Sequence, residues 1–517
     1  KDDGEVIYKN RDILIVKYNN LNKTQDIHIP PIKKTSSSFG TKLRNSLESG
    51  KKFQKGDILA EYDCFMNGVP SYGYNVFTAY MPWFGYNHED ALVISESLSK
   101  KTIMNSIDKV YIPIYEYTLM QEFYNDVENS YVYFPSVGQT IKNDIIACVI
   151  SPRESATSNS TDLKNRVQMS LKNMSLSNLL NFRASENPKF LTDRIKSKLI
   201  NGKITGIKIH RFKKPENIDM IDKKLQDTLE KIYLKYIAFI SETLNDLGKY
   251  FHRQYIELLL KKYYIYRDKG KGTKGDISLT DICYLIELEI SKEEHTHIGD
   301  KLANRYANKG IVSLILPDEL RPIAIESNKP IDLIYNPFGV YSRMNHGQVL
   351  EGLISKSVMY CNEHIKNHSE NTKVVIEWLN ENVLKFIDQS YYDRINDEII
   401  KKLDDPNFHN MFVEDIKQSN LFIEAPSFAE VDIKNLMKNS INCKETVLLK
   451  KDLIKYMKQK LKVDINFPEE DIYLKNIFCS PIYIQKLSKI VSKIINARDF
   501  GSVKSITRQP TKGRASG

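Results

Sequence analysis

Short runs in which apolar and polar residues alternate fill the first part of the chain. The segments "DILIVKY" (12–18) and "DILAEYD" (57–63) are bounded by glycine and polar turns, as strands of a sheet are. The uninterrupted apolar run "ALVIS" (91–95) is typical of a buried strand, and "KITGIKIHRF" (203–212) returns to the β pattern. Between these strands lies 151–193, a stretch rich in Ser, Asn and Lys, which we expect to be an exposed excursion.

The spacing of apolar residues changes to three or four between 218 and about 266. Pro215 stands just before this segment, where a proline can help to start a helix, so the pattern predicts a helical hairpin or a coiled-coil pair. Glycines and β-type runs return between 275 and 360. From about 347 to 480 the pattern is mainly helical, and "PIYIQKLSKIVSKIINARDFG" (481–501) predicts a helix or a helix pair.

Length and charge narrow the class of protein. A chain of 517 residues, of which 41% are apolar, is long enough for two to four domains. No run approaches the ~20 apolar residues that a membrane helix needs, so no membrane partner is expected. The net charge of +10 permits a polyanionic partner without requiring one, and the segment Arg498–Gly517 concentrates five basic residues beside one acidic residue.

The cysteine pattern leaves one metal alternative open. Six cysteines are scattered without a CxxC pair, which favours free thiols in a reducing compartment. In "CNEHIKNH" a helix would bring Cys361, His364 and His368 near one face, as zinc ligands could be. A fourth ligand is not evident, and a polar helix surface is the simpler interpretation.

The stretch "GDKLANRYANKG" (299–310) combines backbone freedom with positive charge. Lys301, Arg305 and Lys309 are four residues apart, so they would form one basic stripe on a helix or converge on a shared anion from a loop. Lysine offers a compact charge and arginine a fork that binds two oxygens, which suits phosphate. The alternative interpretation is a solvated charged face.

Two further motifs carry charges that suit phosphate chemistry. In "GYNHED" (85–90), Glu89 and Asp90 precede a buried run and could approach Mg²⁺, which often takes one or two carboxylates together with substrate phosphates. A helix N-terminus or a turn is the alternative. In "NPFGVYSRMNHGQVLE" (336–351), Arg343 projects from a turn and could hold a triphosphate, with a structural salt bridge as the alternative.

Taken together and in order, these motifs closely resemble elements of the β subunit of multisubunit DNA-dependent RNA polymerases. "GDKLANRYANKG", "MPWFGYNHEDALVISE" and "PIDLIYNPFGVYSRMNHGQVLE" are similar to three long motifs of that family. "KGDILAEYD", "KITGIKIHRF" and "INARDFGSVKSITRQPTKGRAS" add weaker similarity. The resemblance covers nearly the whole chain, with 151–193 and 361–480 poorly matched.

The resemblance implies an active-centre role, as part of a nucleotidyltransferase that is not active as this chain alone. Lys301 and Lys309 would contact nascent RNA and the incoming nucleotide, and Arg343 would reach the triphosphate. Glu89 and Asp90 would approach the second, nucleotide-borne Mg²⁺, while the primary Mg²⁺ site lies on a β′-like subunit. Arg305 and, in the basic tail, Arg508 and Arg514 are further predicted contacts to nucleic acid or nucleotide.

The implied fold is α+β, with a double-psi β-barrel core, a flap or wall β domain and added helical segments. The resemblance divides the chain into these regions: 1–130, the first part of the hybrid-binding barrel region; 131–285, flap or wall with the helical hairpin; 286–360, the second part of the hybrid-binding barrel region; 361–480, an external helical region; 481–517, a C-terminal anchor and basic tail. In this family the flap contacts promoter-specificity factors, and 151–193 is the candidate for that surface.

Three departures from the family pattern shape the remaining expectations. The family's N-terminal half and its last segment have no counterpart in the sequence, and Asn496 stands where the family has histidine. We therefore expect a split β-like subunit with an N-terminal β-like partner, β′-like subunits, DNA template, RNA product and nucleoside triphosphates. The composition fits a giant bacteriophage, and hence host bacterial cytoplasm, while an organellar source or a trimmed subunit is an alternative. A non-catalytic polymerase-related scaffold or nucleic-acid-binding module is the alternative function.

Overall fold

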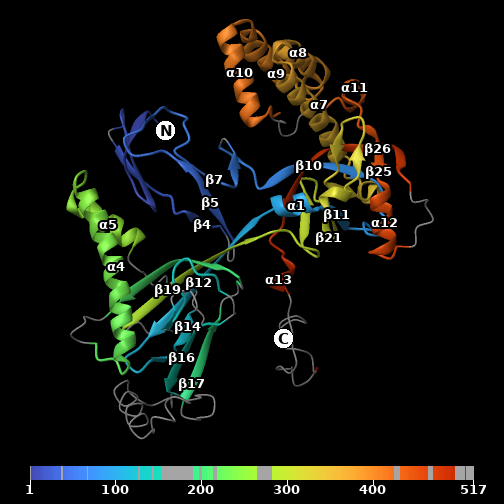
Figure 1. Cartoon of the computed structure of the whole chain (residues 1–517). Coiled ribbons are helices and arrows are strands. Elements are labelled where there is room, and N and C mark those ends of the chain that lie inside the picture. Colours follow the sequence, from blue (N-terminus) through green and yellow to red (C-terminus); the bar gives the residue numbers. More distant parts are fainter. Residues whose placement is uncertain are drawn as a thin grey trace. The chain divides into compact units, whose positions relative to one another are not determined.

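The computed structural model divides the chain into two compact units (Figure 1). The first unit comprises 1–71 and 104–294, and the second comprises 72–103 and 295–517. The predicted segment 1–130 therefore contributes to both units. The structure describes the following residues: 2–21, 23–35, 39–66, 68–125, 129–141, 145–152, 190–196, 199, 201–212, 218–264, 282–423, 431–463, 470–494 and 507.

In its described residues, the first unit is built from β-sheets and a helical hairpin. Its elements are β1 (Gly4–Lys9), β2 (Ile13–Tyr18), β3 (Lys23–His28), β4 (Ile32–Lys34), β5 (Phe39–Ser46), β6 (Lys52–Phe53), β7 (Ala60–Tyr62), β8 (Phe65–Met66), β9 (Val69–Pro70), β12 (Met104–Ile114), β13 (Leu119–Met120), β14 (Phe123–Asn125), β15 (Ser130–Val132), β16 (Ile145–Pro152), β17 (Phe190–Lys196), β18 (Lys203–Arg211), α4 (Lys223–Gly248), α5 (Arg253–Tyr263) and β19 (Tyr284–Glu294).

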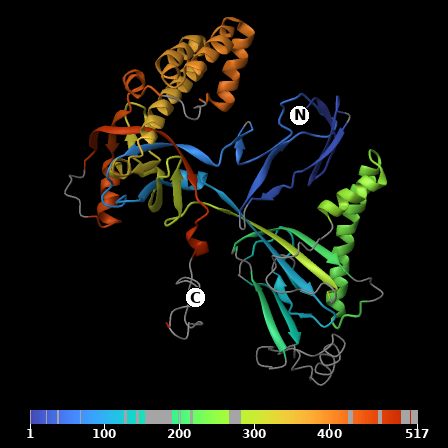
Figure 2. The ribbon, with the colours of Figure 1, turned by 180° about the vertical axis from the view of Figure 1, so that it is seen from behind.

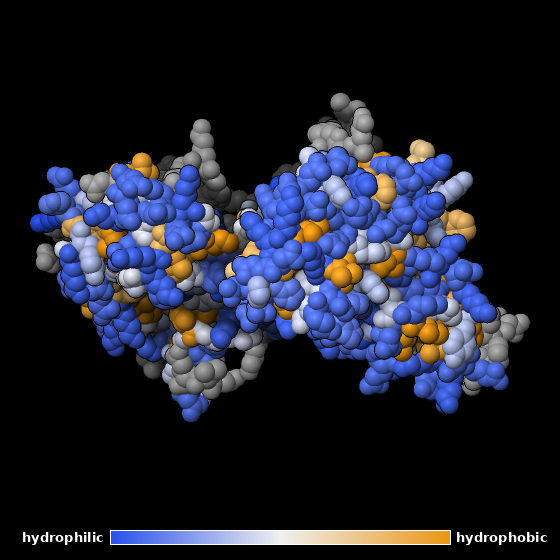
Figure 3. All heavy atoms as spheres, turned by 90° about the horizontal axis from the view of Figure 1, so that it is seen from above, coloured by the Kyte–Doolittle hydropathy of each residue, from blue (hydrophilic) through white to orange (hydrophobic). Residues whose placement is uncertain are grey.

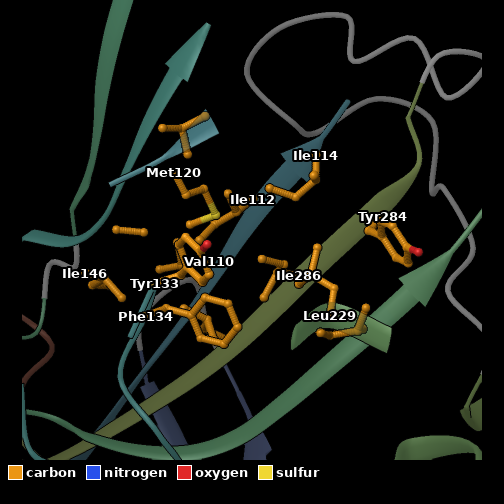
Figure 4. Packing of buried hydrophobic residues seen from close by; sticks show 14 of the residues in the cluster. Val110, Ile112, Ile114, Met120, Tyr133, Phe134, Ile146, Leu229, Tyr284 and Ile286 are labelled. Carbon is orange, nitrogen blue, oxygen red and sulfur yellow. The ribbon is translucent and has the colours of Figure 1, made fainter. Parts of the chain in front are cut away.

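The largest core of this unit lies on one face of the strands β18, β19 and β12, which are adjacent in an antiparallel sheet. Alternate residues point to the same face of a strand, so Val110, Ile112 and Ile114 of β12 bury together with Ile286 of β19. Leu229 of α4 closes this core from the helical side (Figure 4). The alternating pattern of the sequence thus translates directly into a one-sided core.

The predicted helical hairpin is confirmed as α4 and α5. Asp222 is the N-cap of helix α4: its carboxylate accepts a hydrogen bond from the amide of Leu225. The two helices share a buried cluster with one face of the four-stranded sheet β3–β2–β1–β6, through Ile13 and Ile15. The other face of that sheet packs separately through Leu14. Helix and sheet therefore bury each other's apolar sides.

The second unit combines a large sheet with a group of helices. Its elements are β10 (Gly73–Tyr80), β11 (Ala91–Ser95), α1 (Glu96–Lys101), β20 (Lys301–Asn304), β21 (Lys309–Leu316), β22 (Ile323–Ala324), β23 (Lys329–Pro330), β24 (Leu333–Tyr335), α6 (Pro337–Arg343), α7 (Gly347–Asn367), α8 (Thr372–Asn382), α9 (Gln389–Ile395), α10 (Pro406–Ser419), α11 (Ile433–Asn439), β25 (Lys444–Leu449), α12 (Lys451–Gln459), β26 (Ile472–Lys486) and α13 (Val491–Ile494).

Six strands of the second unit close into a ring. Strand β10 pairs with β24, β24 with β11, β11 with β21, β21 with β20 and β20 with β26, and β26 returns to pair with β10. The pairs β10–β24 and β11–β21 are parallel, and the others are antiparallel. A sheet that returns to its first strand is a barrel and has no free edges within the ring.

Side chains from every strand fill the ring. The interior cluster takes Val76 and Tyr80 from β10, Leu92 and Ile94 from β11, Leu302 from β20, Val312 from β21, Leu333 and Tyr335 from β24, and Ile482 and Ile484 from β26. On the outside, Phe77 and Val93 belong to a second cluster that includes Leu453 of α12. Inner and outer residues alternate along the strands, as barrel walls require.

Helices α8, α9 and α10 gather at the end of α7 that lies away from β10 and β26 (Figures 1 and 2). Their shared core includes Cys361 and Ile365 of α7 and Leu379 of α8. Cys361 is fully buried, and burial raises the pKa of its thiol to about 12. Because its side chain is buried in this cluster, Cys361 is a core residue and not part of a polar helix surface. Within the described ranges no cluster of His, Cys, Asp or Glu could hold a metal ion.

The long strand β26 corrects the helical prediction for this part of the chain. Residues 481–486 belong to β26 and not to a helix, and β25 is a second strand in the region expected to be mainly helical. Ile482 and Ile484 alternate into the barrel, but an i, i+3 apolar spacing also occurs in the sequence that follows them. Only pairing with distant β10 and β20 selects the strand.

None of the described helices is long and apolar enough to span a membrane. On the face drawn in Figure 3, apolar side chains form separate small groups among hydrophilic ones. Most of the predicted excursion 151–193 lies outside the described residues, although its last residues begin β17.

Glu287 of the first unit should stabilise the fold in a pH-dependent way. Burial opposes its charge, but hydrogen bonds from His210 and Lys109 lower the pKa of its carboxyl from 4.5 to about 2. A carboxyl whose pKa is lower in the folded protein than in the unfolded chain stabilises the fold at pH values above its ordinary pKa. For Glu287 the full contribution is on the order of 3 kcal/mol, and it is lost as the pH falls from about 4.5 towards 2.

We therefore expect Glu287→Gln to lower the urea-derived free energy of unfolding at pH 7, with the difference from the unsubstituted protein shrinking below pH 4. Glu242→Gln, on the exposed side of α4, is the matched control and should change little. Equal losses at pH 7 and pH 3 would contradict the electrostatic account.

Candidate active-centre face

The stretch "GDKLANRYANKG" forms a strand, a turn and a strand, which excludes the helical stripe. Strands β20 and β21 pair antiparallel and are joined by residues 305–308. The side-chain oxygen of Asn304 accepts hydrogen bonds from the amides of Tyr306 (2.9 Å) and Asn308 (3.1 Å), which closes the turn. Ala307 adopts a φ of 58° within it.

Lys301 and Lys309 lie on one face of this hairpin. Lys309 is paired with Ala303, and Lys301 stands two residues before Ala303 on the same strand. Residues two apart share a face, so the lysines are diagonal neighbours, for which Cα atoms are typically ~7–8 Å apart. The alternate residue Leu302 points into the barrel, so both lysines face outward.

The loop that carries Glu89 and Asp90 lies directly against β21. The amide of Ile311 donates to the carbonyl of Asp90 (2.8 Å). A Cβ added to Gly310 would approach the same carbonyl oxygen to 2.5 Å and Leu92 Cγ to 2.5 Å. Gly310 therefore allows the contact that brings Asp90 beside the strand of Lys309. Glu89 is exposed, with a φ of 52°.

Arg343 reaches the same place from helix α6. The side chain of Asn336 caps this helix, and Met344 ends it in the left-handed conformation. The guanidinium of Arg343 lies 2.5 Å from Asp90 Oδ1, and both side chains are partly exposed, at 42% and 44%. The hydrogen bond to Asp90 raises the pKa of the Arg343 guanidinium, and the charge of Glu89 adds to this. The predicted salt-bridge alternative for Arg343 is therefore present in this state.

The charges of this face are only partly neutralised by the chain itself. Asp90 and Arg343 pair with each other, whereas neither Lys301 nor Lys309 has an ion-pair partner among the residues that the structure describes. Two unpaired ammonium groups on one exposed face suit an anion with several oxygens, such as phosphate.

The two carboxylates fit a metal ion only if the ion brings other ligands. Glu89 and Asp90 are adjacent, and no third metal-binding group joins them in the described part of the chain. Mg²⁺ is commonly held by one or two carboxylates together with substrate phosphates and water. The donor set thus fits an ion that arrives bound to a phosphate.

Arg305 is directed to a different place. Its guanidinium lies over the ring of Tyr483, 4.0 Å from the centroid, and 3.8 Å from a carboxylate oxygen of Glu351. With Glu351 and Leu350 it lines a cavity of about 800 Å³ to which neither Lys301 nor Lys309 contributes. The structure therefore brings five of the predicted residues together and leaves Arg305 apart. Arg508 and Arg514 lie outside the described residues.

Two buried interactions behind this face were not predicted from the sequence. Asp300, next to Lys301, pairs with Lys486 at 3.2 Å, and both side chains are almost fully buried. Asp300 also accepts hydrogen bonds from the amides of His297 and Val491, so its charge holds the backbone that precedes the hairpin. Gln348 is the second case: its side chain is fully buried and accepts a hydrogen bond from Asn304. In the sequence, the only sign of this residue was the dipeptide Gly347-Gln348 within the motif that contains Arg343.

The fold and this clustered face agree with the comparison to protein families. The family model for RNA polymerase Rpb2, domain 6, matches residues 50–516, so the chain belongs to this family. The match includes every residue of the candidate face.

Curated relatives define the class of protein more closely. The DNA-directed RNA polymerase subunit beta of Lawsonia intracellularis is 26% identical over 99% of this chain and 41% of its own length. The proteins of the same name from Phocaeicola vulgatus and Myxococcus xanthus are 28% and 24% identical over 64% and 91% of this chain. The chain spans about two fifths or less of the length of these relatives.

Substitution of Gly310 tests the contact that assembles the face. Gly310→Ala would force its Cβ against the Asp90 carbonyl, and we expect a loss of about 1–3 kcal/mol in the free energy of unfolding. Gly206→Ala, in a strand where the nearest atom would be 3.9 Å away, is the matched control. Thermal unfolding of both variants checks this, and equal melting temperatures would contradict the steric argument.

Proposed function

We propose that this chain contributes part of the active centre of a multisubunit DNA-dependent RNA polymerase. The observation that carries the proposal is the position of Lys301 and Lys309 beside the Asp90–Arg343 pair, with no ion-pair partner for either lysine in the described part of the chain. Family membership and the curated relatives support it. In this role the face contributes to binding the RNA–DNA hybrid and the nucleoside triphosphate.

The chemistry of nucleotide addition gives each group a task. In-line transfer of a nucleotidyl group builds negative charge on the phosphate oxygens, and fixed cations stabilise that charge. Lys301 and Lys309 supply two such cations next to the reacting end of the RNA. Arg343 releases Asp90 and binds the triphosphate instead. A guanidinium can form two hydrogen bonds to a phosphate just as it does to a carboxylate.

Glu89 and Asp90 complete this arrangement. With Arg343 turned to the triphosphate, Asp90 and Glu89 would be the carboxylates that hold a Mg²⁺ ion carried by the nucleotide. The primary Mg²⁺ site belongs to a β′-like partner in this proposal. Its ion polarises the phosphate and activates the attacking hydroxyl when bound.

The remaining finer assignments follow from the same proposal. The closed six-stranded ring with two parallel pairs supports a barrel of the double-psi type. The first unit, with its helical hairpin, is the candidate flap or wall, and a promoter-specificity factor its candidate partner. The N-terminal β-like subunit, the phage source, the host cytoplasm and the roles of Arg305, Arg508 and Arg514 stay predictions.

Alanine substitution tests the two lysines. In polymerase assembled with this chain, Lys301→Ala and Lys309→Ala should each slow nucleotide addition at least tenfold, because each removes a cation at the developing phosphate charge. Single-turnover extension of an RNA primer measures the rate. Lys100→Ala, which removes an exposed lysine of α1 paired with Glu96, is the control. Normal rates in both active-centre variants would refute the assignment.

Purification tests the assembly and separates the proposal from the scaffold alternative. A tag on this chain should recover, in equal amount, a β′-like chain with the three metal-binding aspartates and a chain similar to the N-terminal half of β. Mass spectrometry identifies the recovered chains. Recovery of this chain alone, or with unrelated proteins, would favour the non-catalytic scaffold or nucleic-acid-binding module.

A further inference from the structure

A buried polar network links the lysine hairpin to the start of helix α7. The amide nitrogen of Asn304 donates to Gln348 Oε1 at 2.7 Å, and the hydroxyl of Tyr80 donates to the same oxygen at 3.3 Å. Tyr335 donates to the carbonyl of Asn308 at 3.4 Å. These residues lie between 0% and 8% exposed, so the hydrogen bonds form out of contact with bulk water.

Asn304 uses both ends of its side chain in this network. Its oxygen holds the amides of Tyr306 and Asn308, and its nitrogen is held by Gln348. The turn between the two lysines is therefore fixed from inside the barrel by a residue of another element. Hydrogen bonds in a low-dielectric interior are strong, and an unmatched partner there is costly.

The position of Asn304 gives this network a specific consequence. Lys301 opens the strand that Asn304 ends, and Lys309 directly follows Asn308, whose amide Asn304 holds. A change in the turn would alter the pairing of Ala303 with Lys309 and hence the spacing of the two lysines. The side chains of Lys301 and Lys309 point outward, so the buried hydrogen bonds constrain their backbone and not the side chains directly.

We propose that Gln348 is a positioning residue for Lys301 and Lys309, acting through Asn304. The inference rests on the proposed function of the two lysines. Gln348 touches neither the reacting phosphate nor the lysines. It holds the turn in the geometry in which both ammonium groups meet the same phosphate region, and a displacement of about 1 Å in such a site can cost up to ~100-fold in rate.

The test uses polymerase purified through a tag on this chain. Gln348→Met removes the acceptor oxygen at similar length, and we expect kcat for nucleotide addition to fall about tenfold with the nucleotide KM changed less than twofold. Gln348→Glu keeps an acceptor for Asn304 and Tyr80 and should stay within about threefold of the unsubstituted enzyme. If Gln348 had only a structural role, Gln348→Glu would not restore the rate, because a buried glutamate destabilises the fold at least as much as a methionine does.

A matched control separates positioning from general loss of a buried amide. Asn380 is 1% exposed, lies in α8 and donates to the carbonyl of Tyr392. Asn380→Leu should leave kcat unchanged. The proposal is overturned if Asn380→Leu lowers kcat as much as Gln348→Met does, or if Gln348→Met leaves kcat unchanged, or if Gln348→Glu is as slow as Gln348→Met.

A combined substitution distinguishes failure of this inference from failure of the proposed function. If Gln348 acts through the lysines, Gln348→Met should slow an enzyme that already carries both Lys301→Ala and Lys309→Ala less than threefold, instead of tenfold. Additive tenfold losses would overturn the positioning role while leaving the lysines essential. Normal rates for Lys301→Ala and Lys309→Ala would refute the proposed function itself.

Discussion

Closure of the barrel by β26 is the constraint on which the candidate face depends. This strand pairs with β10 over eight residues, from Gly73–Gln485 to Tyr80–Phe478, and with β20 over three. Without β26, the strand that begins at Lys301 would be a sheet edge with unpaired backbone groups. A Cβ at Gly73 would come within 2.3 Å of the Ile484 carbonyl oxygen, so the two strands approach closely from the start of their contact. Segments more than 380 residues apart must meet before the hairpin has a fixed position.

The charged residues around this barrel differ in burial and in pairing. Asp300 and Lys486 are buried, paired and held by further hydrogen bonds, which is the condition under which charges persist in an interior. Asp90 and Arg343 are paired but partly exposed, so exchanging partners involves little desolvation. Lys301 and Lys309 have no counter-charge among the described residues. Around this barrel the Asp300–Lys486 pair is therefore buried, whereas the Asp90–Arg343 pair is partly exposed.

Much of this arrangement could be predicted from local sequence, and part of it could not. The alternating segments gave the strands of the first unit, and the three- and four-residue spacing gave α4 and α5, because burial on one face imposes these periods. Residue types and spacing made Lys301, Lys309 and Arg343 candidates for phosphate contacts beside simpler alternatives, and this role stays a prediction. Residues 481–486 of β26 were mistaken for helix because the strands that they pair with, β10 and β20, are distant in sequence. The separation of Arg305 was also hidden, since stacking on Tyr483 depends on that same long-range pairing.

The two ends of helix α7 pack against different parts of the second unit, and this arrangement has a mechanical consequence. Gln348 lies in its first turn, at the barrel, and Cys361 and Ile365 lie in the core shared with the other helices. A helix of 21 residues is about 30 Å long and stiff. A tilt of a few degrees about the barrel end therefore moves the far end by an ångström or more. By the same lever, a ligand or protein that shifts the helical group would exert a torque on the turn between the two lysines.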